Sequence, residues 1–425
     1  MSPLVMTLLI LLIVFVALLS GKVGYGTVGG GVIVALIVLN ILTPAEALAG
    51  LANTNVVIMF AMTIISAGLM KTRLIENIMG LVNKIGKSEI ALVAGFGLIA
   101  GVLAQFMNAF LAVACLLPLI NGTCKELKVP KSRVIYPVMI IALTFIFWLP
   151  IGPGAATYAQ KNGYLESYGS EFTFGIFDMT LVRLPGVILT TLFSIFILPK
   201  LCPTISSLDV KEDLGREVQK SKLAPWKEAA AYIITAGTVI LMILASALKL
   251  QTFLIASCGA LLMVLFGILS EREAFNSTNW GMLFLFAGIL PLATALTKTG
   301  ASDVVADAII AIIGGSTNPW VISIVFTLIC FISTQFLSNT AFVQVFTPLA
   351  LMVCVRLNMN PVGIMGCVNI ACTASYLTPM ANPGIPLCMD AGGYSLKDCV
   401  KMGILPGLLI CAVGVVWCAL FFPPY

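Results

Sequence analysis

Long apolar stretches recur along almost the whole chain, and this pattern limits the possible folds more than any other feature. They fall near residues 3–20, 27–43, 54–70, 88–107, 110–127, 133–160 and 179–200, then near 228–248, 251–270, 279–297, 317–337, 341–357, 361–390 and 402–423. A helix of about 20 residues crosses the hydrocarbon core of a bilayer. Because that core offers no water to backbone N–H and C=O groups, such stretches must form helices. The sequence therefore predicts an all-α polytopic membrane protein.

Composition agrees with this prediction and argues against other classes. Of 425 residues, 60% are hydrophobic and only 10% are charged, whereas a soluble domain carries about 25% charged residues. The net charge of +5 comes from connecting segments, so no nucleic-acid partner is expected. Residues 3–20 lack a positively charged leader and are expected to be the first membrane helix, not a signal peptide.

The residues that usually carry enzymatic or metal chemistry are scarce. The chain has no histidine and no CxxC motif, and its twelve cysteines lie mostly inside apolar stretches, where they are expected to pack. We expect no cofactor. A membrane-embedded enzyme is not expected either, because a nucleophile–base pair or a metal cluster cannot be assembled.

The second half of the chain repeats the first at an offset of 230 residues. The repeat pairs Gln105 with Gln335, Pro118 with Pro348, Pro153 and Gly154 with Pro383 and Gly384, and Gly163 and Tyr164 with Gly393 and Tyr394. Seven apolar segments in residues 1–200 face seven in residues 228–425, and the charged segment 201–227 is the predicted cytoplasmic linker. Two copies that each contain interrupted helices are typical of a secondary transporter.

Basic residues predict the topology, because they concentrate in cytoplasmic loops. Lys71, Arg73, Lys84 and Lys87 precede segment 88–107, and Lys125, Lys128, Lys131 and Arg133 follow segment 110–127. If both clusters are cytoplasmic, the two segments between them form a re-entrant hairpin with its tip at Met107–Phe110. The same count makes 317–357 a hairpin that enters from outside. Each half then has five crossings and one hairpin, the halves are inverted, and both termini are outside.

Four breaks in apolar helices are expected at membrane depth. Two are the hairpin tips, and the others are Leu149–Gly154 and Thr378–Gly384, where prolines remove backbone donors. Freed carbonyls can coordinate a cation, and helix N-termini attract an anion. The alternative is that they are simple kinks. Gln105 and Gln335, three residues before the tips, either orient the tip backbone or bridge neighbouring helices.

These motifs resemble the divalent anion/sodium symporter family of the ion transporter superfamily. The resemblance is carried by Ser338-Asn339-Thr340 at a tip and by the run from Thr378 to Pro383, which reads T-P-x-A-x-P. It implies sodium-coupled symport of an organic anion, a carboxylate or dicarboxylate, by a homodimer in the cell membrane. It also implies an elevator mechanism. Residues 1–87 and 228–316 would form the scaffold, and residues 88–200 and 317–425 the moving hairpins and broken helices.

The resemblance also assigns the site residues, position by position. The expected substrate-binding residues are Asn108, Phe110, Pro153, Ser338, Asn339, Thr340, Thr378, Pro379 and Asn382. The expected sodium ligands are Thr334, Ser338, Asn339 and Ala381, with Asn108 and Gly152 at a second sodium site.

The first tip departs from the family pattern, since Ala104, Asn108, Ala109 and Phe110 stand at the positions of Thr334, Ser338, Asn339 and Thr340. We therefore expect a carboxylate with an apolar or uncharged remainder, bound in a cavity that Phe110, Trp148 and Tyr158 help to form. Arg183 is expected to snorkel to the interface. No ionisable residue is expected to be buried at the membrane midplane, which argues against proton coupling. The alternatives are an inorganic oxyanion carrier, a sodium/proton antiporter and, because broken helices also build filters, a channel.

Overall fold

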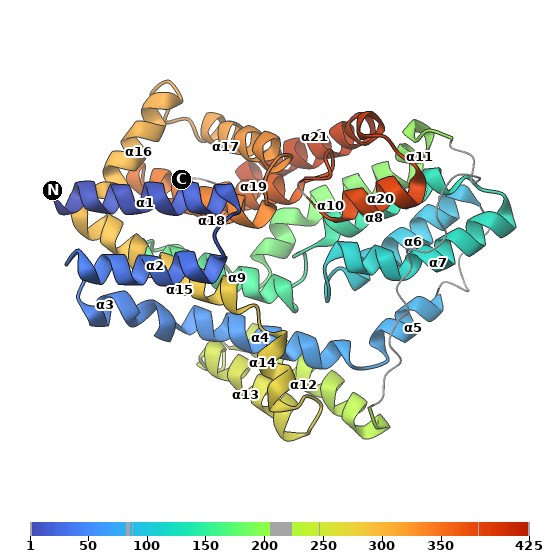
Figure 1. The fold of residues 1–425 in the computed structure, drawn as a ribbon, viewed down its shortest axis with the longest axis horizontal. Coiled ribbons are helices and arrows are strands. Elements are labelled where there is room, and N and C mark those ends of the chain that lie inside the picture. Colours follow the sequence, from blue (N-terminus) through green and yellow to red (C-terminus); the bar gives the residue numbers. More distant parts are fainter. Residues whose placement is uncertain are drawn as a thin grey trace.

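The computed structural model describes residues 2–81, 86, 88–204, 223–245, 247–380 and 382–423. Within these ranges the chain consists of helices and the loops that join them, without a strand (Figure 1). Residues 205–222 of the predicted linker, the predicted sodium ligand Ala381, and Lys84 and Lys87 lie outside the described residues.

The order of helices is the same in the two halves. The first half contains α1 (Pro3–Ser20), α2 (Tyr25–Val38), α3 (Pro44–Leu48), η1 (Ala49–Ala52), α4 (Thr54–Met70), α5 (Leu74–Gly80), α6 (Glu89–Leu103), α7 (Ala109–Leu127), η3 (Lys131–Arg133), α8 (Ile135–Phe145), α9 (Pro153–Ser167), α10 (Asp178–Phe196) and α11 (Leu198–Leu201). The second contains α12 (Pro225–Leu244), α13 (Thr252–Leu265), α14 (Glu271–Ser277), α15 (Trp280–Thr299), α16 (Ala301–Ile312), α17 (Pro319–Thr334), α18 (Asn339–Arg356), α19 (Pro361–Thr373), α20 (Gly384–Gly392) and α21 (Leu396–Phe421). An offset of 230 residues places α6 on α17, α7 on α18 and α8 on α19.

The lengths of the helices support a polytopic membrane protein. Among the described residues, 8 helical stretches are long and apolar enough to cross a bilayer, and five shorter apolar helices accompany them. The predicted segments 133–160 and 361–390 are each two helices, α8 with α9 and α19 with α20. These interruptions fall at the predicted proline and glycine clusters.

Side-chain caps fix several helix starts near the breaks. Asn108 accepts a hydrogen bond from the backbone N–H of Leu111 at 2.8 Å and so begins α7. Asn318 and Asn360 cap α17 and α19 in the same way, and a proline follows each of them. A polar cap followed by proline satisfies the free N–H groups of a first helical turn.

Equivalent helices pack on equivalent partners. Helix α6 lies against α8 as α17 lies against α19, and the pair α2–α15 corresponds to the pair α13–α4. The last helices of the two halves, α10 and α21, pack on each other. In the α2–α15 contact, a Cβ on Gly29 would meet the carbonyl oxygen of Phe284 at 2.1 Å, so only glycine allows this approach.

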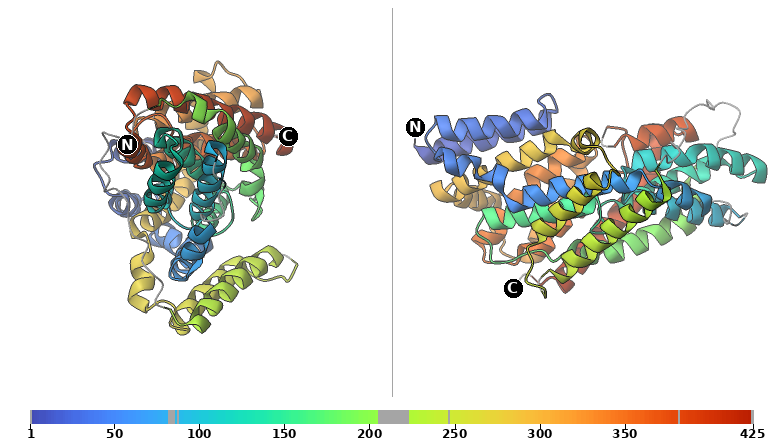
Figure 2. Two further views of the ribbon diagram at one scale, coloured as in Figure 1. Left: turned by 90° about the vertical axis from the view of Figure 1, so that its right-hand side faces the viewer. Right: turned by 90° about the horizontal axis from the view of Figure 1, so that it is seen from below.

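The correspondence has exceptions around α9 and around α12 with α13. Helix α9 packs extensively on α4 and also on α15, whereas α20 packs on α7, α8 and α21. Helices α12 and α13 pair with each other against α4 and project from the rest of the molecule (Figure 2).

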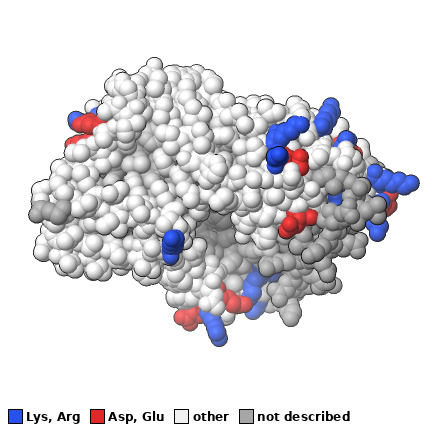
Figure 3. All heavy atoms as spheres, turned by 45° about the horizontal axis from the view of Figure 1, so that its top comes forward, with Lys and Arg blue, Asp and Glu red and all other residues white. Residues whose placement is uncertain are grey.

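Charged side chains occupy restricted parts of the surface. On the face shown in Figure 3, most of the area carries no charge, and Lys and Arg side chains gather mainly toward one end of the molecule. The wide uncharged area fits a surface that faces lipid, where charges are costly.

Candidate functional site

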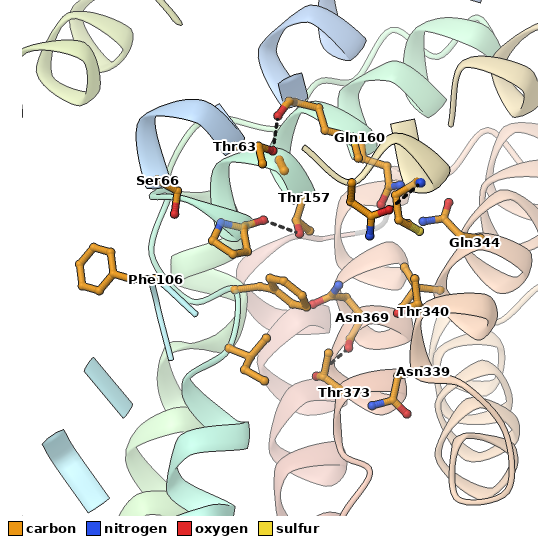
Figure 4. Close-up of a pocket in the computed structure, with 18 of the residues that line it drawn as sticks. Thr63, Ser66, Phe106, Thr157, Gln160, Asn339, Thr340, Gln344, Asn369 and Thr373 are labelled. Carbon is orange, nitrogen blue, oxygen red and sulfur yellow. Dashed lines mark hydrogen bonds between the residues drawn. The ribbon is translucent and has the colours of Figure 1, made fainter. Parts of the chain in front are cut away.

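A cavity of about 650 Å³ lies where both interrupted helices approach α4 and α18. Its wall consists of Met59, Thr63, Ser66, Ala67 and Met70 of α4; Phe106; Leu143, Ile146 and Phe147; Pro153, Ala156, Thr157 and Gln160 of α9; Ser277, Asn279 and Met282; Asn339, Thr340, Val343 and Gln344 of α18; Asn369 and Thr373 of α19; and Asn382. None of these lining residues is charged. Figure 4 shows Thr63, Ser66 and Thr157 on one side and Thr340, Gln344, Asn369 and Thr373 on the other, with the Gln160 side chain reaching toward Gln344.

The second tip, between α17 and α18, holds a compact group of oxygen atoms beside this cavity. The Thr334 hydroxyl donates to Asn339 Oδ1 at 2.7 Å and to the Cys372 carbonyl at 2.9 Å. Asn339 Nδ2 donates to Ser375 Oγ at 2.7 Å. Thr334 and Ser375 are fully buried. Oxygen atoms from two hydroxyls, an amide and a carbonyl are the type of ligand that a hard cation prefers.

The first tip, between α6 and α7, has no equivalent group. At an offset of 230 residues, Ala104, Ala109 and Phe145 stand where Thr334, Asn339 and Ser375 stand in the second half. All three are buried apolar residues. The two halves therefore share a backbone plan but differ in their capacity to hold a cation by side chains.

A glutamine side chain ties each tip to the neighbouring break. Gln335 Nε2 donates to the Ala374 carbonyl at 3.0 Å, and its Oε1 accepts from the Leu377 N–H at 3.1 Å. In the first half, Gln105 donates to the Phe145 carbonyl and accepts from the Leu149 N–H at 3.0 Å. These hydrogen bonds support the bridging alternative: each amide joins the segment before its tip to the backbone of the neighbouring break.

The first break is built on unusual backbone conformations. Gly152 has φ +51°, and a Cβ there would lie 2.8 Å from Ser66 Oγ and 3.2 Å from the Gln105 carbonyl oxygen. Phe147, which lines the cavity, also has a positive φ, +59°. A positive φ at a residue other than glycine, as at Phe147, is strained, and strain of this kind concentrates at functional sites.

The cavity brings together only some of the residues predicted from the sequence. Pro153, Asn339, Thr340 and Asn382 line it. Asn382 Oδ1 also accepts from the Gly384 N–H at 2.8 Å, at the start of α20.

Other predicted residues lie outside the lining. Asn108 and Ser338 are exposed, and the Ser338 hydroxyl lies 3.2 Å from the Tyr25 hydroxyl of α2. Thr378 donates to the Gln335 carbonyl. Phe110, Gly152, Thr334 and Pro379 also lie outside the lining.

The aromatic side chains at the cavity differ from those expected. Phe106 and Phe147 line it, whereas Phe110, Trp148 and Tyr158 do not. The Trp148 indole N–H instead donates to the Thr180 carbonyl at 3.2 Å, which ties the first break to α10.

Several polar lining residues were not among the predicted ligands, notably Thr63, Ser66, Thr157, Gln160, Asn369 and Thr373. Asn369 and Thr373 are four residues apart, on one face of α19 within an apolar segment. Polar residues spaced in this way on a membrane helix are a signal of a polar interior. Gln344, one helical turn beyond Thr340, also lines the cavity.

The expectation for Arg183 was wrong. Arg183 does not snorkel: it is 1% exposed and donates to Asn369 Oδ1 at 2.9 Å, Thr373 Oγ1 at 3.0 Å and the Thr144 carbonyl at 3.1 Å. Lys161 is also 1% exposed, and its Nζ lies 3.4 Å from the Met365 carbonyl oxygen. Two buried cations therefore contact α19, where none was expected.

Comparisons with known proteins agree with a membrane transporter. The citrate transporter family model matches residues 10–350. The sodium-dependent dicarboxylate transporter SdcS of Staphylococcus saprophyticus is 23% identical over 92% of this chain and 81% of that protein. The Na(+)/dicarboxylate cotransporter 3 of Rattus norvegicus is 25% identical over 33% of this chain and 23% of its own length.

Other matches are local or structural. An uncharacterised transporter of Escherichia coli, YfbS, is 31% identical over 40% of this chain. The match spans 27%, 24% and 35% of the lengths of the first three curated relatives. Among solved structures, the YdaH transporter of Alcanivorax borkumensis superposes with a TM-score of 0.65 at 14% identity, over 90% of this chain and 88% of that one. MtrF of Neisseria gonorrhoeae superposes with a TM-score of 0.63 at 13% identity, over 100% of this chain and 96% of that one.

Proposed function

Since the chain belongs to the divalent anion/sodium symporter family, whose citrate transporter model it matches, we propose that it carries an organic anion across the cell membrane together with sodium. The transported anion is a carboxylate or dicarboxylate. The family and the apolar helices make the chain a multi-pass membrane transporter; the anion and the coupling ion are the proposed part.

The oxygen group at the second tip is the observation that carries the proposal. Thr334, Asn339 and Ser375 meet beside the Cys372 carbonyl, at the end of an interrupted helix. Unwound carbonyls and the ends of half-helices hold coupling cations in transporters of this kind. Sodium bound there would lie next to Asn339, which also lines the cavity.

The cavity offers binding groups for an anion. Helices α9 and α18 begin at its wall, at Pro153 and Asn339. Free N–H groups and the positive end of the helix dipole attract negative charge at such helix starts. No Asp or Glu stands among the described lining residues to repel an anion or to exchange a proton, which favours a symporter over a sodium/proton antiporter.

The mode of movement is part of the same proposal. The two interrupted halves would cross the membrane in opposite directions, each with a re-entrant hairpin, α6–α7 and α17–α18. These hairpins and the broken helices would slide as an elevator against a scaffold in a homodimer. The equivalent packing of α6–α8 and α17–α19 supports the two-fold plan.

Uptake by reconstituted protein tests the proposal. Purified protein in proteoliposomes should accumulate labelled succinate or citrate under an inward sodium gradient, and should not do so when choline replaces sodium. Asn339→Ala should abolish this uptake, because it removes both the Thr334 and the Ser375 contacts.

The matched control is Asn318→Ala. Asn318 caps the same hairpin at the far end of α17, away from the cavity, and this variant should transport normally. Normal uptake by Asn339→Ala, or equal uptake in choline, would contradict the proposal. Sulfate uptake without succinate or citrate uptake would favour an inorganic oxyanion carrier instead.

A further inference from the structure

Two amide side chains face the cavity on the side away from α4. Gln344 of α18 is 2% exposed and Asn369 of α19 is 1% exposed, and both line the cavity. Figure 4 places them on the same wall as Thr340 and Thr373. Neither residue belongs to the tip or to the breaks.

The oxygen atom of each amide accepts a hydrogen bond from a residue that lies outside the cavity lining. Tyr164 of α9 donates its hydroxyl to Gln344 Oε1, and Arg183 of α10 donates Nη1 to Asn369 Oδ1 at 2.9 Å. An arginine can only donate, so the Asn369 atom that faces it must be the oxygen. Within the described part of the chain, neither Gln344 Nε2 nor Asn369 Nδ2 has an acceptor. Neither nitrogen is among the enclosed polar atoms, so both N–H₂ groups are accessible from the cavity and remain for a molecule bound there.

The positive charge of Arg183, which donates to Asn369, also lacks a negative partner among the described residues. Arg183 remains a cation at any physiological pH, and its three hydrogen bonds go to neutral oxygens of Asn369, Thr373 and Thr144. In the described residues no carboxylate pairs with it, and its Nε has no partner. A buried unpaired charge is unfavourable. An anion on the cavity side of Asn369 and Thr373 would compensate it.

We propose that Asn369 and Gln344 form a second binding arm that donates hydrogen bonds to a second carboxylate of the substrate, and that Arg183 positions and charges this arm. The inference rests on the proposed function and assigns side chains to the second carboxylate of a dicarboxylate, with the first carboxylate at the tip around Asn339 and Thr340. The sequence predicted a substrate with one carboxylate and an apolar or uncharged remainder. We now propose a second carboxylate in place of that remainder, because the prediction did not include the buried cation Arg183.

The test compares succinate with butyrate, which has the same four-carbon chain and only one carboxylate. Initial uptake is measured in proteoliposomes with the wild type, Asn369→Leu, Gln344→Leu, Arg183→Gln and Arg183→Lys. The matched control is Asn360→Ala, which removes the cap at the opposite end of α19. Thermal unfolding of each purified variant reports whether it is folded.

The wild type should prefer succinate to butyrate by at least about tenfold in kcat/KM, because hydrogen bonds to charged groups are strong. Asn369→Leu and Gln344→Leu should each lose about tenfold for succinate while butyrate uptake changes less than about twofold. Arg183→Gln should behave as Asn369→Leu, and Arg183→Lys should recover part of the preference by keeping the charge. Gln344→Leu leaves the Arg183 contacts intact, so it decides the outcome if the Arg183 variants do not fold.

Two outcomes overturn the second arm alone. In the first, Asn369→Leu and Gln344→Leu both have the same KM for succinate as the wild type. In the second, the variants lose kcat/KM equally for succinate and for butyrate. If the wild type takes up neither succinate nor citrate in sodium, the proposed function fails and the arm fails with it.

Discussion

Among individual residues, Gln105 and Gln335 show most directly how the broken helices are stabilised. Each amide pairs one carbonyl and one N–H that have no helical partner, and each does so at the same place in its half. Within a bilayer, such groups must be satisfied by the protein itself. The glutamines therefore serve the framework of the site and leave the binding contacts to Asn339 and the cavity wall.

Replacing Gln335 by leucine should destabilise the protein. The Leu377 N–H would lose its partner, at roughly 1–3 kcal/mol, and the Ala374 carbonyl would keep only its hydrogen bond from the Tyr376 N–H. We expect a lower Tm for Gln335→Leu in detergent and a weaker stabilisation by added sodium. Gln251→Leu is the control, since Gln251 is exposed at the start of α13 and makes no cap hydrogen bond. Equal Tm values for the two variants would show that the bridge is dispensable.

Part of the site could be predicted at this scale. Asn339 and Thr340, predicted from the family motif at the tip, line the cavity, whereas Ser338 of the same triplet does not. Arg183 was misplaced because its position along α10 suggests an end of the helix, whereas enclosure by α8 and α19 depends on packing between distant segments. Asn369 was missed for the same reason: only the fold shows what stands behind it.

Among the helices, the breaks are the elements on which the site depends. The first break can form only if Gly152 keeps its positive φ and its contact with α4. The order of helices and the positions of both interruptions follow from apolar length and from proline and glycine. Helix α9 packs on α4, whereas its equivalent, α20, packs on α7, α8 and α21. The sequence repeat predicts equivalent positions for α9 and α20, so it could not predict this difference.

Gly152→Ala should therefore destabilise the protein and reduce transport. The positive φ costs an alanine about 1–3 kcal/mol, and its Cβ would also press on Ser66 Oγ at 2.8 Å. Gly169→Ala is the control for a positive φ in open space, because Gly169 has φ +67° with nothing within 4 Å. We expect a larger fall in Tm for Gly152→Ala than for Gly169→Ala. Equal falls would mean that the contact with α4 contributes nothing.

The junction between α4 and α14 carries a pH-dependent ion pair. A hydrogen bond from Lys71 at 2.6 Å, together with bonds from Ser270, lowers the pKa of Glu273 from 4.5 to about 2. Because the pKa is lower in the folded state, the pair stabilises the protein above pH 4.5, and this contribution is lost as the pH falls toward 2.

Glu273→Gln should thus lower stability slightly at neutral pH, by at most about 1 kcal/mol for an exposed pair. Thermal unfolding of the wild type and the variant at a series of pH values measures the difference. It should be constant between pH 5 and 7 and shrink below pH 4.5. A difference that grows in acid would contradict the assignment.

At the scale of the whole molecule, the two halves share the same order of helices but differ in the side chains at their tips. The succession of helices was predictable, since it follows from apolar segments and the repeat. The unequal chemistry of the tips was also visible, in Ala104 and Ala109 opposite Thr334 and Asn339. The buried cations at α19 were not predictable, because their burial depends on contacts from α9 and α10.

Those cations have a consequence for the empty carrier. If α9 and α10 travel with the site, Lys161 and Arg183 make the vacant unit positive, and its outward return opposes an inside-negative voltage. That step then costs up to about 2.3 kcal/mol per charge per 100 mV for a full crossing, whereas an outgoing anion cancels the charge. Vesicles preloaded with unlabelled succinate should therefore take up labelled succinate several-fold faster than vesicles without it, most clearly at a negative potential set by a potassium gradient. Equal rates would mean that the empty carrier returns across the membrane without a voltage penalty. Faster exchange would mean that the protein exchanges anions more readily than it carries out net uptake.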